Sequence, residues 1–395
     1  MGRLVIFISI FLCLSGMNCG RNVEGESITT GAERMDQYLP LLEGRSVAVV
    51  ANHTSLVKDK HLVDTLISHH IDIAKIFSPE HGFRGDKDAG EIIESSKDEK
   101  TGVPVISLYG SRRKPRVSEL DDVDIVIFDI QDVGVRFYTY ISTMHYVMEA
   151  CAESDTEFLL LDRPNPNGFY VCGPVLDTQY RSFVGMHPVP LVHGMTLAEL
   201  ARMINGEGWL EDGRKCDLEW VPCTNYTHDS LYQLPVRPSP NLPNMQSVYL
   251  YPSLGLFEGT IVNVGRGTDF PFQVFGHPDL SGDITYTPES KKNASIEPRH
   301  EDLECQGIDL RDYPVDSLIA EPGIRLQWLY DAYDKLGKTE DFFLPFFINL
   351  SGNEDLKKEI IQGTRIPEVK EKWKNDLSYF LEKREEYLLY EDFDH

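Results

Sequence analysis

Five short apolar runs, each followed by a polar segment, constrain the fold of this chain more than any other feature. The segments between the runs can form helices, most clearly from Tyr140 to Glu153. A strand that is covered on both faces is a continuous apolar run, so strands alternating with helices predict a parallel sheet with helices on both sides. We therefore expect an α/β fold with a doubly wound, Rossmann-like sheet domain. The predicted strands cover residues 46–51, 72–77, 103–108, 123–128 and 157–161.

The polar segments after these strands predict a single site. In open α/β sheets, ligands bind outside the carboxyl ends of the strands, where the tips converge. Polar residues end strands in many proteins. Four strand ends that are rich in polar and charged residues, all on one edge of the sheet, nevertheless favour a functional site. The candidates at the tips are Asn52, His53, Glu80, His81, Arg84, Asp129, Gln131, Asp132, Arg136, Tyr138, Asp162, Arg163 and Asn165.

The second half of the chain is dense in glycine and proline, which indicates fixed rather than flexible loops. We expect Thr196 to cap a helix over 197–205, with Glu199 completing a capping box. The candidate site residues in this half are His193, Asn241, Glu258 and Arg266. Further helices are expected over 324–336, 353–362 and 367–384.

The beginning of the chain has the features of an export signal. Residues 1–19 comprise a positively charged start, an apolar run of about eleven residues and a stretch of small residues that ends at Cys19. The run is too short to span a bilayer permanently. We expect an exported protein of the periplasm or cell envelope. Lipidation of Cys19, which would attach the protein to a membrane, stays open because residues 16–18 match a lipobox poorly.

These features divide the chain into four parts. The signal segment covers residues 1–19, and a polar tether covers 20–34. The Rossmann-like domain that carries the site is expected over 35–270, and a smaller C-terminal α+β domain over 271–395.

The charge of the chain argues against one class of partner. Lysine and arginine number 38 against 63 acidic residues, a net charge of −25, which disfavours nucleic acid as a partner. A small anionic ligand is still compatible with this charge, because guanidinium groups bind carboxylates bidentately. The arginines that lie in glycine- or proline-rich loops are Arg84, Arg136, Arg163 and Arg266.

Neither a cofactor nor a metal is expected from the motifs. The chain has no G-x-G-x-x-G fingerprint, P-loop, G-x-S-x-G elbow or H-E-x-x-H motif, and its cysteine spacing matches no zinc site. Five cysteines lie beyond the signal segment. Because an exported protein meets an oxidising environment, one or two disulfides among them are possible, and at least one cysteine must stay unpaired. The oligomeric state is not indicated.

Three groups of carboxylates suggest catalysis. Glu80 is suited to protonate a leaving oxygen if burial raises its pKa, although an ion pair with Arg84 or Arg136 is the alternative. Asp129 and Asp132 could bind a metal, hydrogen-bond sugar hydroxyls or act as a base. Glu258 is either a second catalytic carboxylate or an acceptor that fixes its own loop.

An ordered set of motifs resembles one family. The chain is similar to the exo-β-N-acetylmuramidase family of the NamZ type over nearly its whole length after the signal. The C-terminal residues Trp373 and 387–390 also resemble that family. The motifs are residues 78–85, 128–140, 161–166, 193–196, 238–241, 256–260 and 265–268.

The resemblance implies a fold and a reaction. The fold would be a Rossmann-like domain and a smaller C-terminal domain with the site in the cleft between them. The reaction would release terminal N-acetylmuramic acid from the non-reducing end of peptidoglycan fragments, so the partners would be muramoyl saccharides. By motif position, Glu80 would be the leading catalytic residue.

Two aspects of that reaction can be examined from the residues. The lactyl carboxylate of muramic acid would suit Arg136 or Arg163. The second catalytic group stays open among Glu258, Asp129, Asp132 and the 2-acetamido group of the substrate, since retaining enzymes place their carboxyl groups only about 5 Å apart.

Two other functions are compatible with the sequence. An exported sugar receptor without catalysis would also be a two-domain α/β protein, although the number of carboxylates at the tips argues against it. A metal-dependent esterase or amidase of the cell wall would lose its activity with a chelator, whereas a glycosidase would not.

Overall fold

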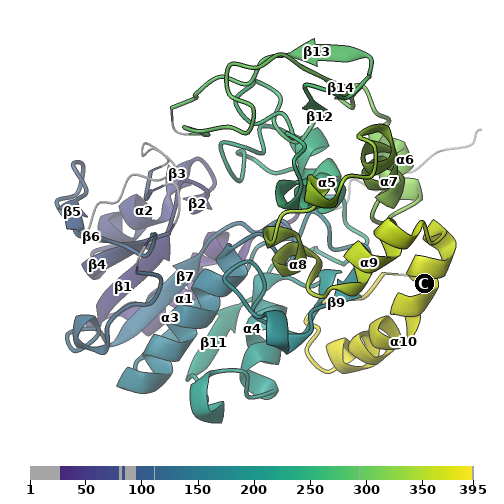
Figure 1. The fold of residues 1–395 in the computed structure, drawn as a ribbon. Helices are drawn as coiled ribbons and strands as arrows, with labels where there is room; N and C mark the ends of the chain where they lie inside the picture. The colour runs from purple at the N-terminus through teal and green to yellow at the C-terminus, as the bar shows by residue number, and fades with distance from the viewer. Residues whose placement is uncertain (1–26, 80–81, 85–94, 111, 293, 394–395) are drawn as a thin grey trace, which may run out of the picture.

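The computed structural model describes residues 27–79, 82–84, 95–110, 112–292 and 294–393. Its centre is a seven-stranded sheet in the order β11-β8-β7-β1-β4-β6-β5, parallel except for β5. All five predicted strands lie in it, which confirms the expected α/β fold (Figure 1). The strands are β1 (Ser46–Ala51), β4 (Asp72–Ser78), β5 (Ser95–Lys97), β6 (Pro104–Ser107), β7 (Ile125–Asp129), β8 (Glu157–Leu161) and β11 (Leu218–Val221).

Helices cover both faces of this sheet. The strand β1 has apolar side chains on both faces, and each set packs against a different group of helices. Ala48 and Val50 pack into the core that includes Met144 and Leu200, from the helices α3 and α4. Val47 and Val49 pack on the opposite face with side chains from α1 and α2. The bounds are α1 (Met35–Leu42), α2 (Leu62–Ser68), α3 (Tyr140–Ser154) and α4 (Leu197–Gly206), with the hairpin strands β2 (Leu56–Val57) and β3 (Lys60–His61).

The predicted capping box at the start of α4 is present. The Thr196 hydroxyl accepts from the backbone N–H of Glu199 at 3.4 Å, and the Glu199 carboxylate accepts from the Thr196 N–H at 2.8 Å. Capping satisfies two N–H groups that a helix leaves without partners. A strand pair, β9 (Cys172–Val175) and β10 (Pro190–Val192), lies between α3 and α4 in the chain.

The C-terminal part contains a small sheet and a set of helices. The sheet has the order β12-β14-β13, and both of its pairs are antiparallel. Figure 1 shows this sheet at the top of the view and α9 and α10 at the right, in yellow. The elements are α5 (Met245–Leu254), β12 (Val274–His277), β13 (Ile284–Tyr286), β14 (Cys305–Asp309), α6 (Val315–Ala320), α7 (Leu326–Lys335), α8 (Phe346–Ser351), α9 (Asp355–Gln362) and α10 (Ile366–Glu385).

Short 3-10 helices lie between these elements. Among them, η5 follows α5 directly and carries Glu258. Their bounds are η1 (Gly31–Glu33), η2 (Val117–Glu119), η3 (Thr178–Tyr180), η4 (Glu211–Gly213), η5 (Gly255–Gly259) and η6 (Glu340–Phe342).

The end of the chain returns to the first part of the molecule. The buried Arg384 of α10 donates to the Gly194 carbonyl, and the Tyr390 hydroxyl donates to Asp162 at 2.6 Å. One hydrophobic cluster also includes side chains from α3, α7 and α10. The two parts therefore share a core, and the boundary expected at residue 270 stays a prediction.

Several expectations concern the start of the chain and the cysteines. The signal segment and residues 20–26 lie outside the described residues. Residues 29–33, expected to belong to a tether, instead pack on the sheet domain, where Gly31 N–H donates to the Asp162 carbonyl at 2.8 Å. The five described cysteines are free thiols, so the disulfides considered from the sequence are not formed among them. Among the described residues, no helix has the length and apolarity to cross a bilayer.

Candidate functional site

The strand tips converge as predicted. The Asn52 side chain, directly after β1, donates to the Tyr140 hydroxyl at the start of α3 at 2.9 Å. The Thr54 hydroxyl accepts from the backbone N–H of Gln131, directly after β7, at 3.0 Å. The carboxyl edge of the sheet is thus tied to the connection between β7 and α3, which supplies one wall of a pocket.

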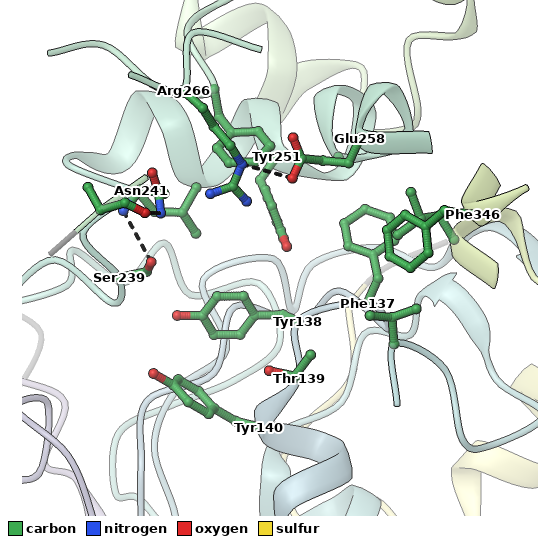
Figure 2. Close-up of a pocket in the computed structure, with 16 residues that line it drawn as sticks. Phe137, Tyr138, Thr139, Tyr140, Ser239, Asn241, Tyr251, Glu258, Arg266 and Phe346 are labelled. Atoms are coloured by element: carbon green, nitrogen blue, oxygen red, sulfur yellow. Dashed lines mark hydrogen bonds and ion pairs between the residues drawn. The ribbon is translucent and has the colours of Figure 1, made fainter. Parts of the chain in front are cut away.

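A pocket of about 260 Å³ lies between this connection and the C-terminal part of the chain. Figure 2 shows Tyr138, Thr139 and Tyr140 on one side of it and Glu258 and Arg266 on the other. Four predicted site residues line it, namely Tyr138, Asn241, Glu258 and Arg266. Its other lining residues are Phe137, Thr139, Tyr140, Val184, Ser239, Leu242, Tyr251, Gly255, Phe272, Ala294, Phe346 and Leu350.

The charged side of the pocket is an ion pair. Arg266 Nε lies 2.8 Å from Glu258 Oε2, and each side chain is a little over a quarter exposed. The guanidinium also lies over the Phe272 ring, 5.0 Å from its centroid. Glu258 is therefore paired with a side chain, whereas the sequence offered a backbone-accepting role as its alternative.

The local sequence explains how Arg266 is presented. Gly265 has a φ of +77°, and a Cβ there would lie 2.7 Å from the Phe270 carbonyl oxygen. The Asn263 side chain accepts from the Gly265 N–H at 2.6 Å, which stabilises the turn. Only glycine fits this conformation and this close approach, so the glycine in the motif serves to place the arginine.

Aromatic rings form the opposite wall. The rings of Tyr138 and Tyr140 meet edge to face at 5.0 Å, and Tyr251 contacts Tyr138 at 5.9 Å and Phe137 at 5.2 Å. The Tyr138 hydroxyl donates to the Pro238 carbonyl at 2.8 Å, which ties this wall to the loop that carries Asn241. Rings beside polar and charged groups suit the apolar face and the hydroxyls of a sugar.

Three of the four arginines selected from the sequence, Arg84, Arg136 and Arg163, bind carboxylates or carbonyl groups of the protein itself. Arg84 pairs with Asp64 and Asp98, whereas the pair with Glu80 considered from the sequence stays a prediction because Glu80 lies outside the described residues. Arg163 makes a buried bidentate pair with Asp129, at 2.6 and 2.9 Å. Arg163 is therefore engaged by an internal carboxylate rather than exposed to a ligand.

Arg136 has a structural environment that the sequence did not indicate. It is buried, and its terminal nitrogens donate to four backbone carbonyls, those of Pro174, Val189, Leu350 and Ser351, at 2.7–3.0 Å. Burial lowers its pKa to about 9. Neither Arg136 nor Arg163 lines the pocket, so the expectation that one of them binds the lactyl carboxylate lacks support from their positions.

The three buried aspartates differ in their partners. Asp129 is fully buried and paired with Arg163, and desolvation raises its pKa. Asp162 accepts from Tyr390 and from the Ala198 N–H, and burial raises its pKa to about 7. Asp132 accepts from the Gly134 N–H through Oδ1, but its buried Oδ2 has no hydrogen-bond partner among the described residues. Burial raises the pKa of Asp132 to about 7 as well.

The remaining predicted residues support the strand tips. His53 bonds the Arg237 carbonyl at 2.8 Å, and burial lowers its pKa. Gln131 donates to the Pro164 carbonyl and Asn165 to the Met195 carbonyl. His193 is fully buried, and desolvation lowers its pKa to about 3. None of these four lines the pocket.

Two predicted site residues cannot be compared with the structure, and two residues of the pocket were not predicted. Glu80 and His81 lie outside the described residues, so their predicted roles stay predictions. Tyr251 and Phe346 line the pocket but were not among the site residues predicted from the sequence. Phe346 is 41% exposed at the pocket, and no periodicity or motif distinguished it from the core phenylalanines.

One cluster of carboxylates could be considered for a metal. Glu149, Glu153 and Glu211 bring oxygens within 4.8 Å of one another, away from the pocket residues. The Lys114 ammonium lies 2.6 Å from Glu149 and 2.7 Å from Glu153, so a cation already occupies this cluster.

A parallel sheet with an aromatic and charged pocket beside its carboxyl edge defines a two-part α/β protein with a small-molecule site. The models of exo-β-N-acetylmuramidase NamZ match this chain, the N-terminal one over residues 47–246 and the C-terminal one over 249–390. The peptidoglycan β-N-acetylmuramidase NamZ of Bacillus subtilis (strain 168) is 39% identical over 390 residues, 92% of this chain and 91% of that protein. This chain belongs to the NamZ exo-β-N-acetylmuramidase family, as its motifs predicted.

Two solved structures share the fold. Both are DUF1343 family proteins from Bacteroides fragilis NCTC 9343. One is 48% identical with a TM-score of 0.86 and covers 93% of this chain and 99% of its own. The other is 29% identical with a TM-score of 0.78 and covers 92% and 99%. The arrangement of the central sheet and the smaller C-terminal part therefore recurs in experimentally solved relatives.

Proposed function

We propose that this chain is an exo-acting β-N-acetylmuramidase that releases terminal N-acetylmuramic acid from the non-reducing end of peptidoglycan fragments. Membership of the NamZ family supports the reaction and the substrate class. The observation that carries the proposal is the pocket with the Glu258–Arg266 pair facing tyrosine rings. Its volume of about 260 Å³ is below the roughly 300–1,000 Å³ of drug-sized sites and suits one terminal sugar.

Glu80 is the general acid in this proposal. In the sequence, Glu80 follows the last residue of β4, Ser78, by two positions, and β4 lies beside β1 in the sheet. Glycoside hydrolysis needs a protonated carboxyl near the leaving oxygen, and the motif position of Glu80 supports it as that group. The proton passes from the carboxyl to the glycosidic oxygen as the bond to the anomeric carbon breaks.

Glu258 is the second carboxylate in this proposal. It lines the pocket and is partly exposed, so its negative charge can stabilise an oxocarbenium-like transition state. Asp129 is less suited to this role because it is fully buried and engaged by Arg163. Retention of the anomeric configuration would indicate a first attack by Glu258 or by the 2-acetamido group, whereas inversion would indicate direct attack by water.

The first test is hydrolysis of a chromogenic β-N-acetylmuramide. We expect Glu80→Gln to lower turnover at least about 100-fold, the lower end of general acid contributions, with an unchanged melting temperature. Glu371→Gln is the matched control, because Glu371 is an exposed residue of α10. Near wild-type turnover of a folded Glu80→Gln protein would refute the acid assignment.

Two further outcomes would replace the proposed function. Tight binding of the muramide without release of the chromophore would identify a sugar receptor. Loss of activity with a chelator would identify a metal-dependent enzyme. NMR of the first-formed anomer of the released sugar would identify the stereochemical course.

The proposal includes export to the periplasm or cell envelope. Peptidoglycan lies outside the cytoplasm, and the sequence of residues 1–19 is typical of a secretory signal. Mass spectrometry of the mature N-terminus tests this directly. An acylated Cys19 at the mature N-terminus would show a lipid anchor, an unmodified cleaved end would show secretion, and an intact Met1 would contradict export.

A further inference from the structure

The pocket has a closed end and an open end. At the closed end, the Asn241 amide donates to the Ala294 carbonyl at 2.9 Å, so the two loops that carry these residues meet. Asn241, Ser239 and Leu242 line this end and are buried. Phe346 also lines the pocket, but its side chain is exposed, and Figure 2 shows it on the far side of the pocket from Asn241. A substrate longer than one sugar therefore leaves the pocket past Phe346.

Phe346 differs from the other phenylalanines of its segment. Phe343 and Phe347 are buried, and their rings contact each other at 4.7 Å. Among the described residues, Phe346 is the only phenylalanine with an exposed side chain, and its ring contacts neither another ring nor a cation. Covering an exposed apolar ring is favourable, and the face of an aromatic ring suits the C–H face of a sugar.

The packing of α8 on η5 holds this ring beside Glu258. A Cβ at Gly259, the residue after Glu258, would lie 2.4 Å from the Cα of Phe347, so the two backbones are in direct contact. The Leu344 N–H also donates to the Gly259 carbonyl at 2.9 Å. Arg136 fixes the other end of α8 by donating to the carbonyls of its last two residues. The ring is thus a fixed surface next to the second carboxylate of the proposed reaction.

We propose that the Phe346 ring is the platform for the leaving sugar, the N-acetylglucosamine to which the terminal muramic acid is linked. This assignment rests on the proposed function, because it names the residue that binds the part of the substrate outside the pocket. The volume of about 260 Å³ suits one sugar, so the next sugar lies at the open end, where the ring is exposed. Phe346 thus selects saccharides among muramides and takes no part in proton transfer.

The test compares two muramides that differ only in the leaving group, the β-1,4-linked disaccharide with N-acetylglucosamine and β-N-acetylmuramyl fluoride, which has no leaving sugar. We expect Phe346→Ala to lower kcat/KM for the disaccharide about fivefold or more, the effect of one lost ring contact. The value for the fluoride should stay within about twofold. Phe346→Trp should behave like the wild type because it keeps an aromatic face, whereas Phe346→Leu, which keeps apolar volume without a ring, should behave like the alanine variant.

Binding gives a readout that does not depend on turnover. The S-linked disaccharide, in which sulfur replaces the glycosidic oxygen, should bind Phe346→Ala about fivefold more weakly than the wild type in calorimetry. Free N-acetylmuramic acid should bind both proteins equally. Tyr379→Ala is the control, because it removes an exposed ring from α10, a helix that does not line the pocket.

The possible failures are distinguishable. If the wild-type protein cleaves neither the disaccharide nor the fluoride, the proposed function itself fails. If the wild type cleaves both, and Phe346→Ala and Phe346→Leu keep full activity on the disaccharide, only the assignment of Phe346 is overturned. An equal loss on both substrates would also overturn it, because it would place the ring against the terminal sugar or show a general effect on the site.

Discussion

Replacing Arg136 with methionine separates a structural role from a substrate-binding role. Methionine keeps much of the length of the side chain but provides no hydrogen-bond donor. The substitution would remove the donor from the backbone carbonyls of Pro174, Leu350 and Ser351, while the Val189 carbonyl would keep the Leu176 N–H at 3.2 Å. Because Arg136 is 2% exposed, water does not reach these groups without rearrangement.

The expected cost follows from the number of carbonyls. An unsatisfied buried acceptor costs on the order of 1–3 kcal/mol, so the three carbonyls cost about 3 kcal/mol even at the low end. The unfolding entropy of a 395-residue protein is about 0.8 kcal/mol/K at about 2.1 cal/mol/K per residue. The melting temperature of Arg136→Met should therefore fall by about 4 °C or more.

Thermal unfolding monitored by circular dichroism checks this expectation, together with the midpoint of urea unfolding. Arg365→Met is the matched control and should unfold like the wild type, because that side chain is largely exposed. A melting temperature within 1 °C of the wild type, with lost affinity for the muramide, would refute the structural role. It would return Arg136 to the substrate-binding role expected from the sequence.

Two more substitutions test the buried polar groups. The pKa of Asp132 is raised to about 7 from 3.8, so its stabilising contribution is complete below about pH 4 and is lost as the pH rises through 7. Relative to the wild type, Asp132→Asn should therefore gain up to about 1.4 kcal/mol of unfolding free energy per pH unit between pH 4 and 7. Urea unfolding at several pH values measures this gain. A difference between the two proteins that does not change with pH would contradict the raised pKa of Asp132. Tyr390→Phe removes a hydroxyl that donates to Asp162 and accepts from the Cys223 N–H, and should cost about 1–3 kcal/mol of unfolding free energy. Tyr379→Phe, at an exposed position of α10, should unfold like the wild type, and equal stability of the two variants would refute the role of the Tyr390 hydroxyl.

The sheet was predictable because its strands are buried on both faces. In β1, alternate residues enter the two different cores, so every position needs an apolar side chain and the run is visible in the sequence. The helix α4 was predictable for a similar local reason, since its capping box lies within four residues. The edge strands β5 and β11 were missed, because the polar residues of Ser95–Lys97 and Leu218–Val221 break the apolar pattern.

The site was only partly predictable, because the role of a charged residue depends on distant neighbours. The sequence identified Glu258 and Arg266 as candidates, but it could not show that they pair with each other. It grouped Arg163 with them, although Asp129 from the neighbouring strand engages Arg163 fully. Phe346 carries no local signal, since its exposure depends on where α8 packs.

The pocket exists only when the two parts of the chain are packed together. The two parts are here the regions matched by the two family models, 47–246 and 249–390. Tyr138 and Tyr140 belong to the first part, whereas Glu258, Arg266 and Phe346 belong to the second. Arg136 joins these parts, because it follows β7 in the chain and donates to the last two residues of α8, the helix that begins with Phe346. Although Arg136 does not line the pocket, it thus holds one wall of the site against the other, so we expect its loss to lower activity through loosening of α8.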